Sequence, residues 1–505
     1  MLNNYIHSGQ TAQAIDACAQ NTLHIPSLIL MEHAAIECVK QIENLVQENH
    51  SIFILCGPGN NGGDGLAIAR LLYLNHYNVV CYCPRKQHMS ESEKVQFEII
   101  QSLNIPFTHS YLDAISQMKK SDVLIDALFG IGLSRSIEGN YKELIEASNE
   151  LDCLTISIDM PSGIDATKGT MLGCSVDADY TISLDCYKIG QWIQDGVYSC
   201  GKLSCVSIGI PNTLHERVLD PIVVLNEDLV RSMFPYRCNF YHKGMFGKAL
   251  MIGGSSSMPG AISMAAKACY HSGVGTLTLM VPNCIADLMA IKLDVAMLLR
   301  ANSHNNETFD RTSVSLLKNV IDNYSHVSIG NGMQKTASTD ALVDCILHSH
   351  IPAIIDADAI QSVGKHLDWL NREEPVILTP HIKEMSDLTG LSIEAILSQP
   401  FDCVRNFCLA HPNCIVVLKS DQTLIGYQHQ IYVLNAPNQA LAKGGSGDLL
   451  CGIITGLFGQ CQDALSAAVC GVYLHSLAAQ TDLDGAVFQP DDLIHNLDDA
   501  FKKMR

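Results

Sequence analysis

The sequence predicts an α/β protein of two domains, each built on a mainly parallel sheet with helices on both faces. From residue 51 onward, short runs rich in β-branched residues alternate with helical stretches, a pattern typical of such sheets. The 505 residues fit three domains of ~150 residues or two larger α/β units. Each half has its own strands and glycine loops, and no internal repeat relates the halves. We therefore expect one domain over residues 1–215 and a second over 221–505.

Two series of candidate strands support this division. Between the first two strands, residues 65–74 are predicted to be helical, because apolar residues recur there at helical spacing. The chain turns polar and irregular after Ile210, and a domain boundary is expected near 212–225. The candidate strands are 51–56, 79–83, 123–126, 155–159, 180–184 and 205–209 in the first series, and 248–252, 276–281, 327–330, 353–356, 376–379 and 415–419 in the second.

Composition and charge exclude several classes of partner. The chain has 32 basic and 52 acidic side chains and a formal net charge of −20, whereas nucleic acids and anionic membranes select basic surfaces. We therefore expect no nucleic-acid or membrane partner. The N-terminus carries no secretory pattern, and the longest uncharged apolar run, 449–459, is far shorter than the ~20 residues of a membrane span. These observations predict a cytoplasmic protein.

The twenty cysteines are expected to be reduced and inert. They are scattered, no C-x-x-C occurs, and many lie in apolar runs. Cys81 with Cys83, and Cys200 with Cys205, lack further ligands at zinc-site spacing. We expect no cysteine in either functional site.

A glycine-rich loop follows the first candidate strand. Residues 57–65 read Gly-Pro-Gly-Asn-Asn-Gly-Gly-Asp-Gly and contain G-x-G-x-x-G, but a dinucleotide-binding domain also needs an acidic residue ~20 positions later. That place reads Tyr-Cys-Pro-Arg-Lys at 82–86, so the NAD fingerprint is incomplete, although Arg85 and Lys86 favour a 2′-phosphate. Glycines let a ligand approach the backbone, while Asn and Asp add oriented donors and acceptors. The alternative is a tight turn capped by Asn or Asp.

Two more candidate strands end in an aspartate followed by a glycine- or proline-containing turn. Asp126 precedes Ala-Leu-Phe-Gly, and Asp159 precedes Met-Pro-Ser-Gly. Ligands of open α/β sheets bind at the carboxyl ends of strands. Each aspartate alone is explained as well by helix capping as by function. Three such loops at strand ends together predict one pocket.

These motifs resemble those of the NAD(P)H-hydrate epimerase family. The resemblance rests on 59–65, 126–130 and 159–163, with 31–35 similar to an upstream helical segment, and covers roughly residues 5–211. It implies a Rossmann-like three-layer αβα domain that interconverts the R and S epimers at C6 of hydrated NADH or NADPH. It also implies Asp159 as the acid/base group and a potassium ion held by Asn61, Asp126 and Ser162, whose oxygen donors suit a hard cation. The implied hydrate contacts are Asn60, Asn61, Gly62, Gly63, Asp64, Gly130, Ile131, Gly132, Leu133, Ser134, Arg135, Ser136 and Asp159.

The second domain carries a glycine nest followed by an aspartate. Residues 438–448 end in Lys-Gly-Gly-Ser-Gly-Asp and lead directly into an apolar helical stretch. Free N–H groups and the positive helix end at such a nest stabilise charge on a transferred phosphoryl group, and Asp448 is placed to accept a proton from a substrate hydroxyl. Alternatively, Asp448 only complements the helix dipole. The pattern resembles the ribokinase-like fold, so a sugar or vitamin kinase is a competing interpretation.

Further segments resemble the ADP-dependent NAD(P)H-hydrate dehydratase family over residues 221–505. They are 242–247, 253–261, 356–359, 378–381 and 438–448. The resemblance implies that the hydrate site is lined by Ala261, Gly332, His381 and Asp448, and that the adenine nucleotide is held by Lys419, Ser420, Asp421, Gln422, Thr423 and Gly447. It implies that Asp448 takes the proton of the C6 hydroxyl, which accepts the terminal phosphate of ADP before elimination, giving AMP and phosphate. Mg²⁺ would bridge the phosphate oxygens.

Three segments depart from the dehydratase pattern. The family's Gly-Pro-Gly-Leu-Gly turn reads Gly-Asn-Gly-Met at 330–333, and its Pro-His-Pro-Gly-Glu reads Pro-His-Ile-Lys-Glu at 380–384. Its Lys-Gly-x-x-Thr loop reads Lys-Ser-Asp-Gln-Thr at 419–423, which bears on nucleotide contacts. His381 alone is compatible with a core histidine, but its place after a strand and Thr-Pro favours a site role.

Together the resemblances predict a fused enzyme that repairs damaged nicotinamide cofactors, an epimerase feeding a dehydratase specific for the S-hydrate. The expected ligands are the hydrates of NADH and NADPH (NADHX and NADPHX), with ADP as co-substrate, and the family implies a homo-oligomer. One alternative is a ribokinase-like small-molecule kinase with a Rossmann accessory domain. Another is a dinucleotide-binding or scaffold protein without turnover.

Overall fold

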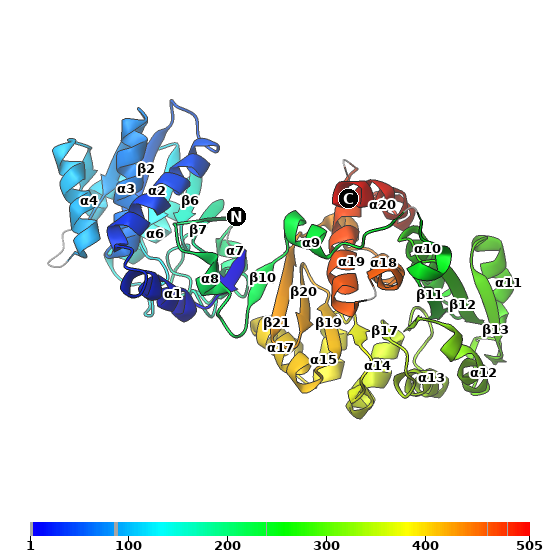
Figure 1. Cartoon of the computed structure of the whole chain (residues 1–505). Coiled ribbons are helices and arrows are strands. Elements are labelled where there is room, and N and C mark those ends of the chain that lie inside the picture. The colour runs from blue at the N-terminus through cyan, green and yellow to red at the C-terminus, as the bar shows by residue number, and fades with distance from the viewer. Residues whose placement is uncertain (1–3, 85–88, 239, 462, 482) are drawn as a thin grey trace. The chain divides into compact units, whose positions relative to one another are not determined.

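The computed structural model of the chain describes residues 4–84, 89–238, 240–461, 463–481 and 483–505. It divides into two compact units, Met1–Pro221 and Ile222–Arg505, which are coloured from blue to green and from green to red in Figure 1. The basic pair Arg85 and Lys86 lies outside the described residues. Within the described ranges, no helix is both long enough and apolar enough to cross a membrane.

The first unit is built on a seven-stranded sheet in the order β4-β3-β2-β5-β6-β7-β9, with every pair parallel. This confirms the predicted α/β class. A short parallel pair, β1 (Tyr5–His7) with β8 (Tyr187–Lys188), adds two further strands. The sheet strands are β2 (Ser51–Cys56), β3 (Asn78–Tyr82), β4 (Phe107–Thr108), β5 (Val123–Ala127), β6 (Leu154–Ile158), β7 (Tyr180–Leu184) and β9 (Lys202–Val206).

Helices cover both faces of this sheet, because successive residues of a strand enter two different apolar clusters. In β2, Ile52 and Ile54 pack with α2 (Ser27–Glu43) and α3 (Asn60–Leu74). Phe53 and Leu55 pack on the opposite face with α5 (Tyr111–Met118) and α6 (Asn140–Asn149). The unit is therefore a three-layer αβα structure. The other helices are α1 (Gly9–Asn21), α4 (Glu91–Ser102), α7 (Gly196–Ser199) and α8 (Asn212–His215), with a 3-10 turn at Ile189–Gln191.

Four predicted strand ends in this unit are wrong. The strands expected at 79–83 and 155–159 each end one residue earlier, at Tyr82 and Ile158. The strand expected at 205–209 is Lys202–Val206, because it pairs with β7 and ends level with the last residue of that strand, Leu184. The strand expected at 123–126 runs one residue further, so Asp126 lies inside β5 and is not its last residue, since Ala127 still pairs with Cys56 of β2. The carboxyl side chain of Asp126 is therefore directed into the protein, where it is fully buried.

The second unit has a sheet in the order β13-β12-β11-β16-β17-β18-β19-β20-β21-β10. All its pairs are parallel except those of β20, which runs antiparallel to both neighbours. The strands are β10 (Ile222–Val224), β11 (Lys248–Ile252), β12 (Thr276–Pro282), β13 (Met297–Ala301), β16 (His326–Ile329), β17 (Ala353–Ile355), β18 (Val376–Leu378), β19 (Cys414–Leu418), β20 (Gln422–Tyr427) and β21 (Gln430–Asn435), besides a small hairpin of β14 (Ser303–His304) and β15 (Thr308–Phe309).

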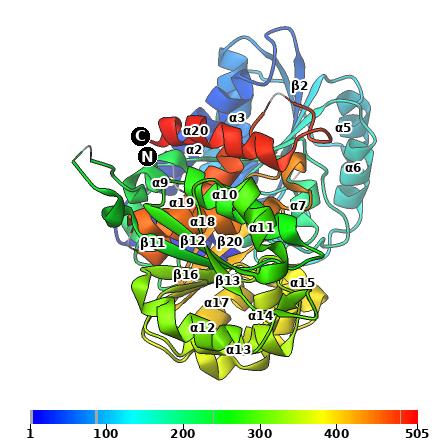
Figure 2. The ribbon, with the colours of Figure 1, turned by 90° about the vertical axis from the view of Figure 1, so that its right-hand side faces the viewer.

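Helices also cover both faces of this second sheet. Its α-helices are α9 (Glu227–Met233), α10 (Pro259–His271), α11 (Asn283–Lys292), α12 (Ser313–Val320), α13 (Ala337–Leu347), α14 (Asp358–Lys365), α15 (Ile382–Thr389), α16 (Ile393–Ser398), α17 (Pro400–Ala410), α18 (Ser446–Cys461), α19 (Ala464–Ala478) and α20 (Pro490–Met504). Its 3-10 turns are Lys243–Phe246, Ile321–Asn323, Leu367–Leu370 and Gln439–Leu441. Figure 2 shows α10, α18 and α19 on one face of the sheet, with α12, α13, α14 and α17 on the other.

The apolar run at 449–459 is the buried body of α18. All of its residues are buried, as expected for a helix that lies within a core and not at a surface. Close packing against α10 requires glycine, because a Cβ atom at Gly452 would lie 2.1 Å from the carbonyl oxygen of Ala265. This contact fixes the start of α18 against the rest of the unit.

We predict opposite effects of adding one methyl group to each of these two packed helices. Gly452→Ala should lower the stability of the unit by about 1–3 kcal/mol or more, because the methyl group meets backbone of α10. Gly260→Ala in α10 is the matched control: its Cβ would meet no atom within 4 Å, and stability should rise by up to about 1 kcal/mol. Scanning calorimetry of both variants measures the difference. Equal melting temperatures would contradict the packing described for α10 and α18.

Candidate functional site

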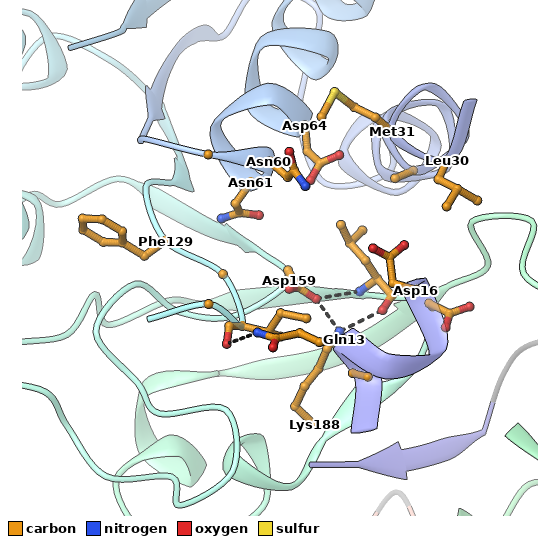
Figure 3. A pocket seen from close by; sticks show the side chains of 18 of the residues that line it. Gln13, Asp16, Leu30, Met31, Asn60, Asn61, Asp64, Phe129, Asp159 and Lys188 are labelled. Carbon is orange, nitrogen blue, oxygen red and sulfur yellow. Dashed lines mark hydrogen bonds and ion pairs between the residues drawn. The ribbon is translucent and has the colours of Figure 1, made fainter. Parts of the chain in front are cut away.

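A cavity of about 480 Å³ lies at the carboxyl ends of the strands in the first unit. Its walls are formed by segments that follow β2, β5, β6 and β7 and by residues of α1 and α2. Figure 3 shows side chains from these different elements surrounding Asp159. Its volume lies in the range of small-molecule and cofactor sites. The strand-end rule therefore predicted the place of this cavity correctly.

Many of the predicted hydrate contacts line the cavity. They are Asn60, Asn61, Asp64, Gly130, Ile131, Gly132, Leu133, Ser134, Arg135 and Asp159. Gly62, Gly63 and Ser136 are not among its lining residues. A Cβ atom added to Gly62 would lie 1.9 Å from the carbonyl oxygen of Gly57. A Cβ atom added to Gly63 would lie 2.5 Å from the Met31 side chain. These two glycines serve the close packing of α3.

The predicted glycine loop is shorter than expected, because α3 already begins at Asn60 and not near residue 65. Gly59 turns the chain with a φ of 101°, a conformation that favours glycine. The first turns of α3 then present Asn60, Asn61 and Asp64 to the cavity. Positions i and i+4 share one helix face, so Asn60 and Asp64 form adjacent polar groups on its wall.

Asp159 is held in a strained backbone conformation at the floor of the cavity. Its φ is 69°, which is uncommon for a residue with a side chain and costs about 1–3 kcal/mol unless the surroundings fix it. Two hydrogen bonds do so: its N–H donates to the Ile182 carbonyl at 2.8 Å, and its carbonyl accepts from Gln191 Nε2 at 2.8 Å. The carboxylate pairs with the ammonium group of Lys188, which also donates to the Leu184 carbonyl at 2.8 Å.

Burial and charge give the acidic groups of the cavity different proton affinities. Burial lowers the pKa of Lys188, but the Asp159 carboxylate outweighs it, so the net pKa lies above the usual lysine value. Burial raises the pKa of Asp64 well above its usual range, and the charges of Asp159 and Asp16 raise it further. The cavity therefore offers an ion-paired carboxylate beside a carboxyl group that retains its proton more readily.

Lys188, Asp16, Asp185 and Cys186 line the cavity and were missed by the sequence analysis. Asp185 directly follows β7, so the strand-end rule that found Asp159 would also have found it. Cys186 shows that the expectation of no cysteine at either site was wrong, although burial raises the pKa of its thiol to about 12 and keeps it unreactive.

Asp185 is connected to two buried histidines. Its Oδ2 lies 3.2 Å from His215 Nε2, and His215 Nδ1 lies 3.1 Å from His7 Nε2. Together with Cys186, Asp185 and His215 offer donor atoms within 4.8 Å of one another. Both ring nitrogens of His215 are thus engaged with side chains, which fixes the imidazole behind the cavity wall.

The predicted potassium ligands lie around the turn after β5. The buried Asp126 carboxylate accepts hydrogen bonds from Ser162 N (2.8 Å), Ser162 Oγ (2.6 Å), Ser157 Oγ (2.9 Å) and Leu128 N (3.1 Å). Burial raises its pKa, and these hydrogen bonds oppose the rise. No basic side chain of the described ranges forms an ion pair with Asp126. The buried amide of Asn61 also has no hydrogen-bond partner. A buried carboxylate without an ion-pair partner in the described ranges and an amide oxygen without a hydrogen-bond donor fit a hard monovalent cation.

A second polar cluster surrounds Asp448 in the other unit. Asp448 lies in the first turn of α18, as predicted. Its Oδ1 accepts from Asn331 Nδ2 at 2.7 Å, and the same nitrogen donates to Asp356 Oδ2 at 3.0 Å. Lys419 Nζ lies 2.9 Å from Asp356 Oδ1. The four residues form one connected chain from a lysine to an aspartate.

The surroundings of Asp448 raise its pKa. Burial raises the pKa of Asp448, the hydrogen bond from Asn331 lowers it, and the charge of Asp356 raises it, for a net value of about 6. A carboxyl with that pKa is ionised at neutral pH and is still basic enough to accept a hydroxyl proton during a reaction. On the opposite side, the buried His475 Nε2 lies 3.1 Å from the Ser446 carbonyl and supports the start of α18.

Only some of the residues predicted to bind the nucleotide lie near one another. Lys419 lies against the glycine nest, since a Cβ atom at Gly447 would lie 3.3 Å from Lys419 Nζ. The expected loop at 419–423 is reduced to an exposed turn at Ser420 and Asp421, because Gln422 and Thr423 belong to β20, which pairs with β19.

The other predicted hydrate residues lie close to this cluster. Gly332 follows Asn331, and a Cβ atom placed on it would lie 3.0 Å from that of Ala261. His381 is half exposed and not a core histidine: its Nδ1 accepts from the Lys383 and Glu384 backbone at the start of α15. The backbone of His381 forms an isolated parallel β-bridge with that of Lys419. Asn331, Asp356 and His475 were not predicted as site residues, although the segments containing Asn331 and Asp356 had been singled out as motifs.

We predict that the buried pair in the cavity is needed for stability of the first unit. Lys188→Met leaves the Asp159 charge unpaired at 7% exposure and should lower the free energy of unfolding by about 3–5 kcal/mol. Adding Asp159→Asn should recover a large part of this loss. Lys142→Met removes an exposed pair with Glu146 and should change stability by less than about 0.5 kcal/mol. Urea unfolding checks this cycle, and additive losses for the two buried changes would contradict it.

Comparisons with known proteins agree with this division of sites. Residues 27–190 match the family model described as YjeF-related protein N-terminus, and residues 249–498 match that of NAD(P)H-hydrate dehydratase. A bifunctional NAD(P)H-hydrate repair enzyme of Moorella thermoacetica is 30% identical over 486 residues, covering 94% of this chain and 92% of that protein.

The same kind of enzyme from Coxiella burnetii is 31% identical, covering 86% of each chain. A structure of the ADP/ATP-dependent NAD(P)H-hydrate dehydratase from Bacillus subtilis, co-crystallized with ATP/Mg²⁺, is 28% identical and covers 55% of this chain and 98% of that chain, with a TM-score of 0.47. The sequence matches confirm the predicted resemblance, and the chain belongs to the family of bifunctional NAD(P)H-hydrate repair enzymes.

Proposed function

We propose that the chain repairs hydrated NADH and NADPH through two activities, an epimerase in the first unit and an ADP-dependent dehydratase in the second. The observation that carries this proposal is that each unit has its own carboxylate at a candidate site. The buried Asp159 lines the cavity, and the partly exposed Asp448 lies in the first turn of α18 beside the glycine nest. The close relatives cover both units, which favours two activities over a kinase with an accessory domain.

In the epimerase, Asp159 acts as the base and Asp64 as a proton donor near C6 of the hydrate. Inversion at C6 needs either ring opening or loss and return of the hydroxyl, and both routes move protons to and from oxygen or nitrogen. The ammonium group of Lys188 pairs with the buried Asp159 carboxylate. The segment 130–135 and the start of α3 then bind the substrate across the cavity, in line with the residues that line it.

In the dehydratase, Asp448 takes the proton from the C6 hydroxyl while the oxygen attacks the terminal phosphorus of ADP. The bond from that phosphorus to AMP breaks, and AMP departs. The C6 phosphate then leaves with the C–O electron pair, driven by the ring nitrogen, and loss of a C5 proton restores the dihydropyridine. Lys419 and the N–H groups near Gly447 stabilise the charge on the transferred group, and Mg²⁺ enters as part of the nucleotide complex.

Three further properties belong to this proposal. ADP is the expected phosphoryl donor by family resemblance. A cytoplasmic location is supported by the cysteines, none of which forms a disulfide in the part of the chain that the structure describes. A homo-oligomer is supported by an apolar groove that exposes Ile29, Ile36 and Val95 between α2 and α4.

We predict that the two activities can be removed one at a time. Purified protein with a mixture of R and S hydrates and ADP should restore all of the reduced nicotinamide absorbance. Asp159→Asn should restore the S portion quickly and the rest only at the spontaneous epimerisation rate. Asp448→Asn should lower the dehydration rate by about 10²–10⁴-fold. Because Asp448 must be ionised, the wild-type dehydration rate should fall as pH drops through about 6.

Each outcome bears on a different part of the proposal. A stable phosphorylated product without recovery of absorbance would establish the kinase alternative. Normal epimerisation by Asp159→Asn would remove the role given to Asp159, and binding without any turnover would leave only the scaffold alternative.

We predict that potassium binds at Asn61, Asp126 and Ser162 and supplies positive charge beside the buried carboxylate. The melting temperature of the first unit should be higher in KCl than in choline chloride at equal ionic strength, because ligand binding to the folded state stabilises it. Asn61→Ala should remove most of this difference while leaving the fold intact. The epimerase rate should show the same ion dependence. Equal melting temperatures of the wild type in the two salts would contradict the site.

A further inference from the structure

Asn331 occupies an unusual position between two carboxylates. It follows β16 and is 1% exposed. Its Nδ2 lies 2.7 Å from Asp448 Oδ1 and 3.0 Å from Asp356 Oδ2. Ionised carboxylates only accept hydrogen bonds, so the amide must turn its NH₂ group toward both of them. Both amide hydrogens are therefore used, one for each carboxylate.

The surroundings keep Asn331 in this orientation. The preceding Gly330 has a φ of 135°, and a Cβ atom there would lie 1.7 Å from the Asp356 carbonyl oxygen. The backbone carbonyl of Asn331 accepts from Gly254 N at 2.7 Å. The turn thus has little freedom to move the side chain away from its two partners.

Asp356 provides a fixed anchor for the amide. Its Oδ1 accepts from Thr379 Oγ1 at 2.6 Å and pairs with Lys419 Nζ at 2.9 Å. Its Oδ2 is left for Asn331. Because Asp356 is itself 1% exposed, it cannot rotate into solvent without losing the ion pair. A rigid path therefore runs from Lys419 to Asp448 through Asp356 and Asn331.

We propose that Asn331 is a positioning residue of the dehydratase, which holds the general base Asp448 by tying it to the Asp356–Lys419 ion pair. This inference rests on the proposed role of Asp448. The donated hydrogen bond fixes one oxygen of Asp448, so the other is directed toward the substrate hydroxyl. It also separates two carboxylates that would otherwise repel each other at short range.

The charged groups that act on Asp448 come from several elements. Asp356 follows β17, Asp358 begins α14, and Lys419 follows β19. His475 of α19 contacts the adjacent Ser446 and is neutral, because burial lowers its pKa to about 4. Removal of the Asn331 amide takes away the hydrogen bond that favours the ionised form and leaves the repulsion from Asp356. The pKa of Asp448 must then rise above about 6.

The amide oxygen of Asn331 adds a second effect. Oδ1 is buried and has no hydrogen-bond partner. A buried acceptor of this kind beside the base is available to a donor group of the bound hydrate. Loss of the side chain should therefore weaken substrate binding as well as raise the pKa of the base.

The test compares the wild type with Asn331→Ala and Asn331→Asp, with Asn323→Ala at an exposed site of the same unit as control. The pH dependence of dehydration is measured with the S-hydrate and ADP, using the full chain. Asn331→Ala should move the acid limb of kcat upward by about one pH unit and raise KM, with kcat largely regained at high pH. Asn331→Asp should move it further, because a third carboxylate is added. Asn323→Ala should match the wild type.

A direct titration separates this inference from the proposed function. The side-chain carboxyl of Asp448 is followed by ¹³C NMR in aspartate-labelled protein, with its signal identified by its absence in Asp448→Asn. A higher Asp448 pKa in Asn331→Ala supports the inference. An unchanged pKa and acid limb, with a uniformly lower rate, would overturn it and leave Asn331 a structural residue. Full dehydration by Asp448→Asn would instead overturn the proposed role of the base, while the titration still decides whether Asn331 controls its ionisation.

Discussion

Buried carboxylate charge is the constraint on which both sites depend. Burial favours the protonated form of an acid, and an unpaired buried charge is costly, so each functional carboxylate needs donors or a cation close by. Asp159 has the ammonium group of Lys188, and Asp356 has that of Lys419. Among the described residues, Asp126 has hydrogen-bond donors but no ammonium or guanidinium partner. The loops at the strand ends are arranged to bring these partners together.

Both units contain a lysine–aspartate ion pair, but the pair lies at a different distance from the proposed base in each. In the first, the ammonium group of Lys188 contacts the Asp159 carboxylate directly in the cavity. In the second, the lysine contacts Asp356, and an amide passes the interaction on to Asp448. A direct ion pair would lower the pKa of Asp448 and make it a weaker base. The intervening amide orients the carboxylate and leaves its pKa at about 6.

The sequence was sufficient for the features that depend on local pattern. Apolar periodicity predicted the parallel strands, and strand-end position predicted the cavity and Asp159 within it. The glycine nest predicted Asp448 at the start of a helix. Partners distant in sequence could not be predicted this way. Lys188 lies 29 positions after Asp159, and the antiparallel β20 takes its direction from pairing with β19 and β21. Such features follow from tertiary contacts, which leave no periodic signal in the chain.

The structure also ranks the departures from the dehydratase pattern. Ser420 lies in an exposed turn, and Lys383 is exposed where the His381–Glu384 capping box remains complete. Neither change removes a buried contact. Asn331 stands where the family turn has a proline, which has no side-chain hydrogen-bond donor. Its amide lies in the hydrogen-bonded path to Asp448. The glycines on both sides of it are retained, so the backbone of the turn is kept while its side chain gains a role. Of these departures from the family motifs, the one at Asn331 is therefore expected to affect the site most, because it creates buried polar contacts.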